Sequence, residues 1–220
     1  MSTQTSKDVS CPHCSAAVKT EMWPGINAQD SPELRERLLN ETLFDWTCPQ
    51  CGYRARLLYP CLYHDRDRQF MVYLAPSGSC SELGAVDVSE KFPRLSSVKK
   101  RVVATLPRRK EKILIFEAGL DDYAVELVKL ALADVMNEKY GKQAESCYFC
   151  YADEAEDKIG FSFVFEGEDG PVLRGTRLDA YEKSFEIVKG SGVPEQDPGF
   201  LSVDAEAARR ILDEYRERKD

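Results

Sequence analysis

The sequence lacks any long apolar run. No stretch of its 220 residues approaches the roughly 18 consecutive apolar residues that a membrane-spanning helix needs. The first ten residues, MSTQTSKDVS, lack the apolar centre of a secretory signal. These absences predict a cytoplasmic protein that does not enter the membrane. The composition, 43% apolar and 31% charged, predicts a soluble globular chain that is long enough for one large domain or two small ones.

The sequence is also poor in the residues and motifs of catalysis. It has only two histidines, His13 and His64, and it contains no G-x-S-x-G, no Walker A motif and no G-x-G-x-x-G. Asp65 and Asp67 suggest a divalent-metal pair, but the arginines within HDRDR favour a solvated turn. No catalytic residue is predicted.

Positive charge is scarce and unevenly placed. The net charge is −8, and residues 113–220 alone carry −12. The exception is residues 99–112, KKRVVATLPRRKEK, with seven basic residues and one acidic residue. This basic run, with its interleaved valines, is typical of a strand with a charged face, and it is the one surface expected to suit an anion. The acidic remainder disfavours nucleic acid and anionic lipid as partners.

Cysteine, in contrast, is abundant. Eight cysteines in a cytoplasmic chain need an explanation other than disulfides, because the cytosol keeps thiols reduced. Six of them form C-x-x-C pairs and two stand alone: Cys11 with Cys14, Cys48 with Cys51, Cys147 with Cys150, then Cys61 and Cys80.

The first two pairs are written almost identically, as CPHC and CPQC. A C-x-x-C turn supplies two sulfurs along one edge of a tetrahedron, and a second such turn supplies the opposite edge. The 33 residues between the pairs, 15–47, include a capped helix and can fold as an insert. Because four cysteines close the coordination sphere, the predicted ion is one structural Zn²⁺ per chain, held by Cys11, Cys14, Cys48 and Cys51.

Other roles for these residues are weaker. A thioredoxin-like dithiol would follow a strand and open a helix, which neither CPxC pair does. His13 is interpreted as an exposed residue at the tip of the first turn. Cys147 and Cys150 lie among aromatic residues in a strand-like run and are expected to be core cysteines. Cys61 and His64 fall on opposite faces of a strand, and no ligation is assigned to them.

Local patterns predict an α+β protein: a zinc-ribbon-like N-terminal module with a helical insert, packed on an α+β C-terminal domain with antiparallel strands. The predicted divisions are a disordered tail 1–8, a zinc-ribbon-like module 9–76, a linker or loop 77–99 and an α+β domain 100–220. Helices are expected from Ser31 onward, over 120–140, over 178–190 and over 203–218. Strands are expected over 53–63, 69–75 and 101–106 and in three runs between 145 and 178.

The chain resembles the CpXC proteins of bacteria and archaea. The resemblance lies in Cys11-Pro12-His13-Cys14, Ile26-Asn27-Ala28, Ser31-Pro32-Glu33-Leu34 and Cys48-Pro49-Gln50-Cys51-Gly52. It continues through LLYPCLYHD and EKILIFEAGLDDYAVELVKL, and covers roughly residues 9–140. It implies a zinc-ribbon-like unit with a helical insert, joined to an α+β part. It carries over the four cysteine ligands and no catalytic residue.

Three functions remain open at this stage. The leading hypothesis is a non-enzymatic, zinc-stabilised interaction or adaptor protein whose partner is an unknown protein. The second is an enzyme with an acidic pocket in the C-terminal domain, built from residues such as Glu117, Asp121 and Asp122. The third is nucleic-acid binding through the ribbon and the basic run 99–112. A homo-oligomer is compatible with each of them.

Overall fold

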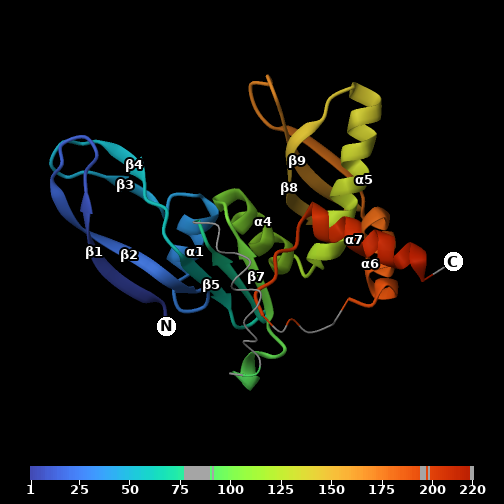
Figure 1. The fold of residues 1–220 in the computed structure, drawn as a ribbon, viewed down its shortest axis with the longest axis horizontal. Coiled ribbons are helices and arrows are strands. Elements are labelled where there is room, and N and C mark those ends of the chain that lie inside the picture. Colours follow the sequence, from blue (N-terminus) through green and yellow to red (C-terminus); the bar gives the residue numbers. More distant parts are fainter. Residues whose placement is uncertain (77–89, 91, 194–196, 198, 219–220) are drawn as a thin grey trace. The chain divides into compact units, whose positions relative to one another are not determined.

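The protein has an α+β fold, seen here in a computed structural model whose described residues are 1–76, 90, 92–193, 197 and 199–218 (Figure 1). They divide into two compact units. The first comprises Met1–Lys110 with Asp197–Leu201, and the second comprises Glu111–Gln196 with Ser202–Asp220. No helix in the described part of the chain is long and apolar enough to cross a membrane.

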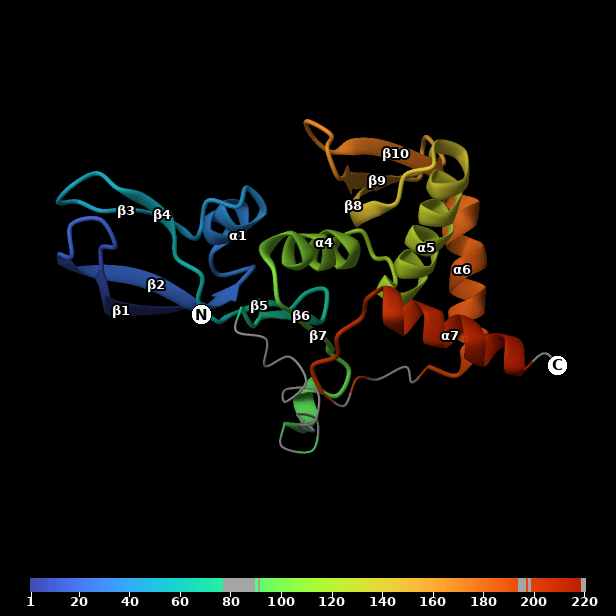
Figure 2. The same ribbon diagram turned by 45° about the horizontal axis from the view of Figure 1, so that its top comes forward.

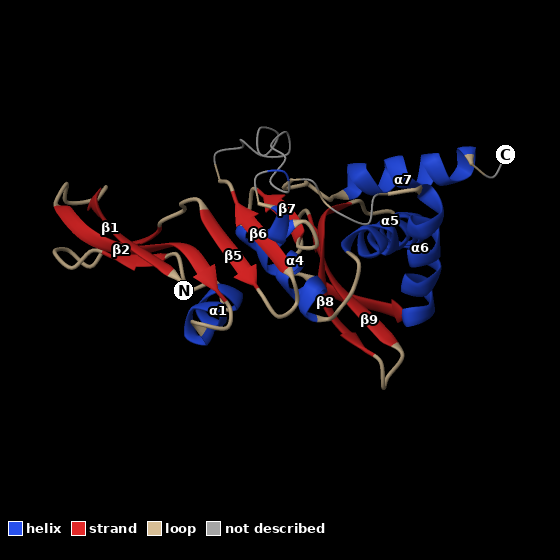
Figure 3. Cartoon of the chain, turned by 90° about the horizontal axis from the view of Figure 1, so that it is seen from below, coloured by secondary structure: helices blue, strands red, loops and turns tan. Residues whose placement is uncertain are grey.

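A mixed five-stranded sheet organises the first unit, with the strand order β1-β2-β5-β6-β7. Figure 3 shows β5, β6 and β7 side by side within this sheet. A separate two-stranded sheet joins β3 and β4. The strands are β1 (Thr3–Ser10), β2 (Ala17–Asn27), β3 (Asp45–Thr47), β4 (Arg54–Arg56), β5 (Cys61–Asp65), β6 (Phe70–Leu74) and β7 (Lys99–Val103).

The prediction of a disordered tail over residues 1–8 is wrong, because strand β1 begins at Thr3. β1 runs antiparallel to β2, from Thr3 opposite Gly25 to Ser10 opposite Ala17. Most of its side chains are exposed and polar, so the strand has no apolar alternation to reveal it. Its order comes from backbone pairing with the 11-residue β2, which the sequence alone does not show.

Helix α1 (Pro32–Leu39) confirms the predicted insert between the CPxC pairs. Pro32 stands in its first turn, where a missing amide costs no intrahelical hydrogen bond. Leu34 and Leu38 form the buried face. Ser31 precedes the helix without a side-chain cap, and its hydroxyl accepts a hydrogen bond from Ser2 at 2.8 Å instead.

The predicted strand over 53–63 is two strands, β4 and β5, separated by residues 57–60. The second predicted strand is β6. Of the predicted turn HDRDR, His64 and Asp65 are the end of β5, and the turn to β6 begins at Arg66. Most of the predicted linker 77–99 lies outside the described residues. Its described end holds a 3₁₀ turn, η1 (Pro93–Leu95), before β7.

The basic run 99–112 is half strand and half helix, and this is a second correction. Only β7 is extended; Leu106–Glu117 forms helix α4, with Pro107 in its first turn. The charged residues of the run are largely internal, since Lys100, Arg101, Arg109 and Lys112 are each at most 1% exposed. Sequence periodicity predicts that charged residues face the solvent, and these four cations do not.

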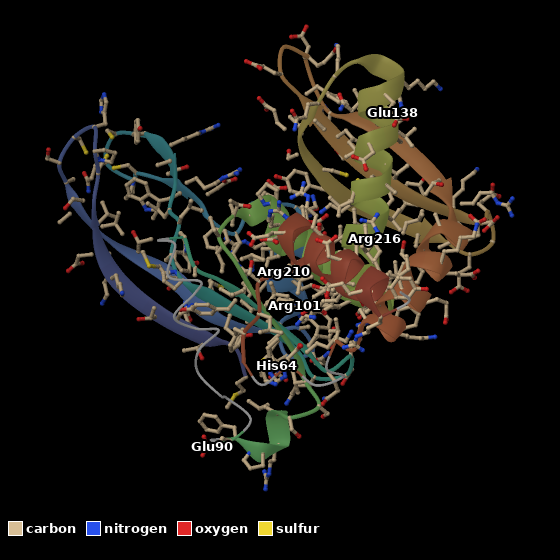
Figure 4. All side chains as sticks on the ribbon, turned by 45° about the vertical axis from the view of Figure 1, so that its right-hand side comes forward. His64, Glu90, Arg101, Glu138, Arg210 and Arg216 are labelled. Carbon is tan, nitrogen blue, oxygen red and sulfur yellow. The ribbon has the colours of Figure 1, made fainter. Side chains whose placement is uncertain are left out.

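Asp197 neutralises part of this buried charge by pairing with Arg101, which is labelled in Figure 4. Its guanidinium donates to Asp197 at 2.5 Å, and the Lys100 ammonium donates to the Asp197 carbonyl at 2.8 Å. Leu201 then pairs with the backbone of β7 through two hydrogen bonds. These contacts place Asp197 and Leu201 beside β7, the edge strand of the first unit's sheet.

The second unit packs helices against a three-stranded antiparallel sheet of order β10-β9-β8, as Figure 2 shows. The strands confirm the three predicted runs: β8 (Ala144–Asp153), β9 (Lys158–Phe165) and β10 (Val172–Arg177). The alternating Phe161, Phe163 and Phe165 of β9 are buried, as their period of two indicates.

Helices α5 (Asp122–Tyr140), α6 (Leu178–Ser191) and α7 (Ala205–Glu217) complete the second unit. Asp121 caps α5 through two backbone amides, and Gly141 ends it in a left-handed conformation, close to the ends of the predicted helix 120–140. α6 ends at Gly192 rather than at the predicted Gly190, which instead lies against the Tyr215 ring of α7. The three helices share an apolar core: Ala124, Leu127, Val188, Ala208 and Ile211.

Candidate metal centre

Each CPxC motif closes a β-hairpin. The first lies between β1 and β2, just beyond the Ser10–Ala17 pair, and the second lies between β3 and β4, just beyond the Thr47–Arg54 pair. The hairpin ends fix the backbone on both sides of each turn, so the cysteines are positioned by strand pairing. The two turns therefore act as rigid carriers of two sulfurs each.

The backbone of the two turns is nearly the same. The Ser15 amide donates to the Cys11 carbonyl at 2.9 Å, and the Gly52 amide donates to the Cys48 carbonyl at 2.9 Å. The residue after each motif has a positive φ, 58° at Ser15 and 72° at Gly52. Glycine reaches this left-handed region without strain, and serine reaches it at a cost. The repeated motif thus produces a repeated conformation.

The four sulfurs meet in one cluster. The Sγ atoms of Cys11, Cys14, Cys48 and Cys51 all lie within 4.8 Å of one another, with separations of 3.7 Å for Cys11–Cys51 and 3.8 Å for Cys14–Cys48. Four sulfurs about 2.3 Å from a central ion define a tetrahedron with edges of about 3.8 Å. The residues present therefore fit a tetrahedral thiolate site.

Two of the four cysteines are buried, and the pKa values of Cys11 and Cys51 are shifted in opposite directions. Cys11 and Cys48 are each 1% exposed, whereas Cys14 and Cys51 face the solvent. Burial alone would raise the pKa of the Cys11 thiol, but hydrogen bonds from the backbone amides of Cys14 and His13 and from the neighbouring thiols lower it to about 6. The pKa of Cys51 is raised to about 12. A backbone hydrogen bond at Tyr53 lowers this pKa, but burial and the other three cysteines together raise it by more.

Four thiolates cannot crowd within a few ångströms unless a cation neutralises them. Four sulfurs this close together suit an ion that accepts several sulfur ligands at once. Soft and borderline-soft transition metals have that property.

His13 does not belong to the cluster. It is exposed in the first turn, as the sequence predicts, and its ring stacks on Tyr53 from the second turn at 5.8 Å with 8° between the planes. The stack bridges the two turns beside the sulfurs. It supports the approach of the hairpins without supplying a ligand.

The other cysteines take separate positions. Among the described residues, the four-cysteine cluster is the one group of three or more Cys, His, Asp or Glu side chains with the spacing of a metal site. Cys61 is buried on β5, donates to the Trp23 carbonyl at 2.9 Å and accepts from Arg109 at 3.1 Å. Cys147 and Cys150 are partly buried on β8, and burial raises the pKa of Cys147 to about 12. Cys80 lies outside the described residues.

The acidic residues singled out in the sequence have structural positions. Asp65, the last residue of β5, is fully buried and accepts hydrogen bonds from the amides of Asp67 and Arg68 in the turn that follows. Asp121 caps α5, and Asp122 is buried 2.9 Å from the Lys112 ammonium. Glu117 is the last residue of α4 and is half-buried.

Two features of this region could not be read from the sequence. The first is Arg109, which is fully buried between Cys61 and the ring of Phe44. The second is a hollow lined by both tryptophans, Trp23 and Trp46. Their members are widely separated along the chain, and no local spacing brings them together.

Comparison with known proteins identifies one similarity. A family model described as CpXC protein matches residues 9–129, which include all four clustered cysteines and more than half of the chain. No curated protein and no solved structure matches the chain.

Proposed function

The chain belongs to the CpXC family, and from that premise we propose that its cysteine cluster binds one structural zinc ion and that the protein is a non-enzymatic interaction or adaptor module of the cytosol. The observation that carries the proposal is the closed set of four sulfurs at the ends of two hairpins.

Zinc is the ion that suits this ligand set best. Structural zinc sites are tetrahedral and take four cysteines in pairs of close spacing. The 3.7 and 3.8 Å sulfur separations fit the zinc–thiolate bond length. β3 and β4 have only three residues each, and such a short hairpin needs further support to be stable. The ion would supply it by joining this hairpin to β1 and β2.

A structural role follows from the closed shell. Catalytic zinc keeps a coordination position for water or substrate, usually beside three protein ligands. Four cysteine sulfurs occupy all tetrahedral positions, and His13 is stacked on Tyr53. The chemistry left to the bound ion is crosslinking of the fold.

The two alternatives receive less support. The acidic active site would use residues such as Asp121 and Asp122. Asp121 instead caps helix α5, and Asp122 forms an ion pair with Lys112. Nucleic-acid binding was expected to use the basic run, and four of its seven cations are buried. An interaction with another protein, whose identity the fold does not specify, is the function that we infer.

Metal analysis tests the proposal. Elemental analysis of native protein should find one zinc per chain, and Cys48→Ser should lose it with a large fall in melting temperature. Cys150→Ser is the matched control, because Cys150 lies outside the cluster, and it should retain the zinc. Native protein without metal, or zinc lost equally from both variants, would reject the four-cysteine site. A salt-dependent gel shift at low ionic strength would favour the nucleic-acid alternative instead.

A further inference from the structure

The hollow lined by Trp23 and Trp46 is a small cavity of about 130 Å³. Its walls come from β2, the end of α1, β3 and the chain just after β4. All of these segments belong to the first unit. Four of the lining residues are aromatic: Trp23, Phe44, Trp46 and Tyr59.

These walls are held in place by their own contacts. The Trp46 indole donates to the Thr20 hydroxyl at 3.1 Å, and this bond ties β3 to β2. The Trp23 amide donates to the Tyr59 hydroxyl oxygen at 3.1 Å. The rings of Phe44 and Tyr59 lie 4.9 Å apart. The cavity is therefore preformed, and a ligand would not have to order its walls first.

Three of the polar side chains on the lining are donors without an acceptor. Tyr59 accepts from Trp23, and its own O–H has no acceptor among the described residues. The Trp23 indole N–H and the exposed Arg37 guanidinium likewise have no hydrogen-bond or ion-pair partner within the described part of the chain. Three donors on one aromatic surface select a ligand that carries acceptor oxygens.

A buried cation adds to this field. Arg109 lies 5.6 Å from the centre of the Phe44 ring and is fully buried. Its Nη2 donates to Cys61, but its Nε and Nη1 have no partner among the described residues. No described carboxylate lies within ion-pair distance of it. A buried charge without a counterion makes its surroundings favourable to an anion.

Two acidic residues on the lining oppose that field weakly. Glu21 is exposed, so water screens its charge. Asp45 is exposed and forms an ion pair with Arg56 at 3.3 Å. The balance of unpartnered groups remains on the side of the donors.

We propose that this cavity binds a small aromatic carboxylate, with the ring between the aromatic walls and the carboxylate on Arg37 and Tyr59. The cavity volume of about 130 Å³ is close to the roughly 150 Å³ of a cavity that holds benzene, so the volume suits a single ring. The carboxylate has two sources, a free small molecule or a partner chain that ends in an aromatic residue. The inference goes beyond the zinc site and does not depend on the identity of the metal.

Intrinsic fluorescence provides a direct test, because the chain has two tryptophans and both line the cavity. Metal-loaded native protein is titrated with phenylacetate, and phenethylamine serves as the charge-reversed probe. Saturable quenching or a shifted emission maximum with phenylacetate, and none with phenethylamine over the same range, is the expected result. Equal responses to both probes would overturn the proposal.

Variants then locate the binding. Arg37→Met should weaken phenylacetate binding about tenfold, since it removes a charge-assisted hydrogen bond, and Tyr59→Phe should weaken it about threefold. Glu21→Gln should tighten it. Arg54→Met is the matched control, because Arg54 does not line the cavity and lies on a neighbouring hollow that shares only Asp45 and Trp46 with it, so the affinity should be unchanged. Loss of binding in Arg54→Met with no loss in Arg37→Met would overturn the assignment.

A peptide arm separates the two sources of the ligand. A short peptide ending in phenylalanine with a free carboxylate is compared with its C-terminal amide. If the acid binds more tightly than phenylacetate and the amide does not bind, the source is a partner chain. If phenylacetate binds and neither peptide does, it is a free small molecule. If none of them binds to protein that contains its full zinc, the cavity proposal fails while the zinc proposal stands.

Discussion

Replacement of Lys129 by methionine is expected to be one of the costliest single changes in the second unit. The Lys129 ammonium lies 2.7 Å from Glu111 and 3.0 Å from Glu126, and all three side chains are buried. Lys112 reaches Glu126 at 3.3 Å and Asp122 at 2.9 Å. Three carboxylates thus share two ammonium groups in a buried network.

Removal of Lys129 leaves Glu111 with one hydrogen bond, from the Phe149 amide at 2.8 Å. Its second oxygen is already buried without a partner. The loss of one partner of a buried ion pair costs about 3–5 kcal/mol, because the remaining charge stays desolvated. Glu126 keeps Lys112, so the expected cost is near the lower end, about 3 kcal/mol.

The assay is urea unfolding of the full chain followed by circular dichroism, with the metal content held constant. Lys183→Met is the matched control, because Lys183 pairs with Asp179 on the exposed surface of α6 and should change stability by about 0.5 kcal/mol or less. Addition of Glu111→Gln to Lys129→Met should restore at least half of the loss. A Lys129→Met cost equal to that of the control would refute the reasoning.

The remaining predictions concern two turns. Burial raises the pKa of the Asp65 carboxyl, but hydrogen bonds from Arg68 and Gln29 hold it below its ordinary value of 3.8. Its stabilisation is therefore present above about pH 4 and is lost as pH falls through the folded pKa. Asp65→Asn should cost about 2 kcal/mol at pH 7 and progressively less in acid, as measured by urea unfolding across pH. Gly52→Ala should lower stability by about 1 kcal/mol because φ is 72°, whereas Ser15→Gly in the matched turn should not, and thermal melting of metal-loaded protein compares them.

The cysteine cluster could be predicted because its information is local. CPHC and CPQC each specify a turn within a few residues, and strand pairing on either side places the sulfurs. Helix α1 and the alternating phenylalanines of β9 were equally legible, because one has a start signal and the other a clean period. The resemblance to the CpXC family depends on the same short sequence motifs.

The misses have a common cause. β1 is polar on most of its surface and is ordered by its partner strand, so its own residues carry little signal. The sequence pattern does not reveal α4, because charged residues such as Arg109 and Lys112 suggest a solvent-facing surface, whereas both are buried. Buried charges depend on partners from distant segments, and sequence periodicity cannot supply those partners. The aromatic cavity is long-range in the same way.

The most direct test of the central claim is the coordination of the metal itself. X-ray absorption at the zinc edge of the native protein should fit four sulfur ligands at about 2.3 Å, with no nitrogen or oxygen in the first shell. That result would establish a closed, structural site built by the two CPxC turns. A first shell with nitrogen or oxygen at about 2.0–2.1 Å, from His13 or from water, would contradict it and would reopen a catalytic role.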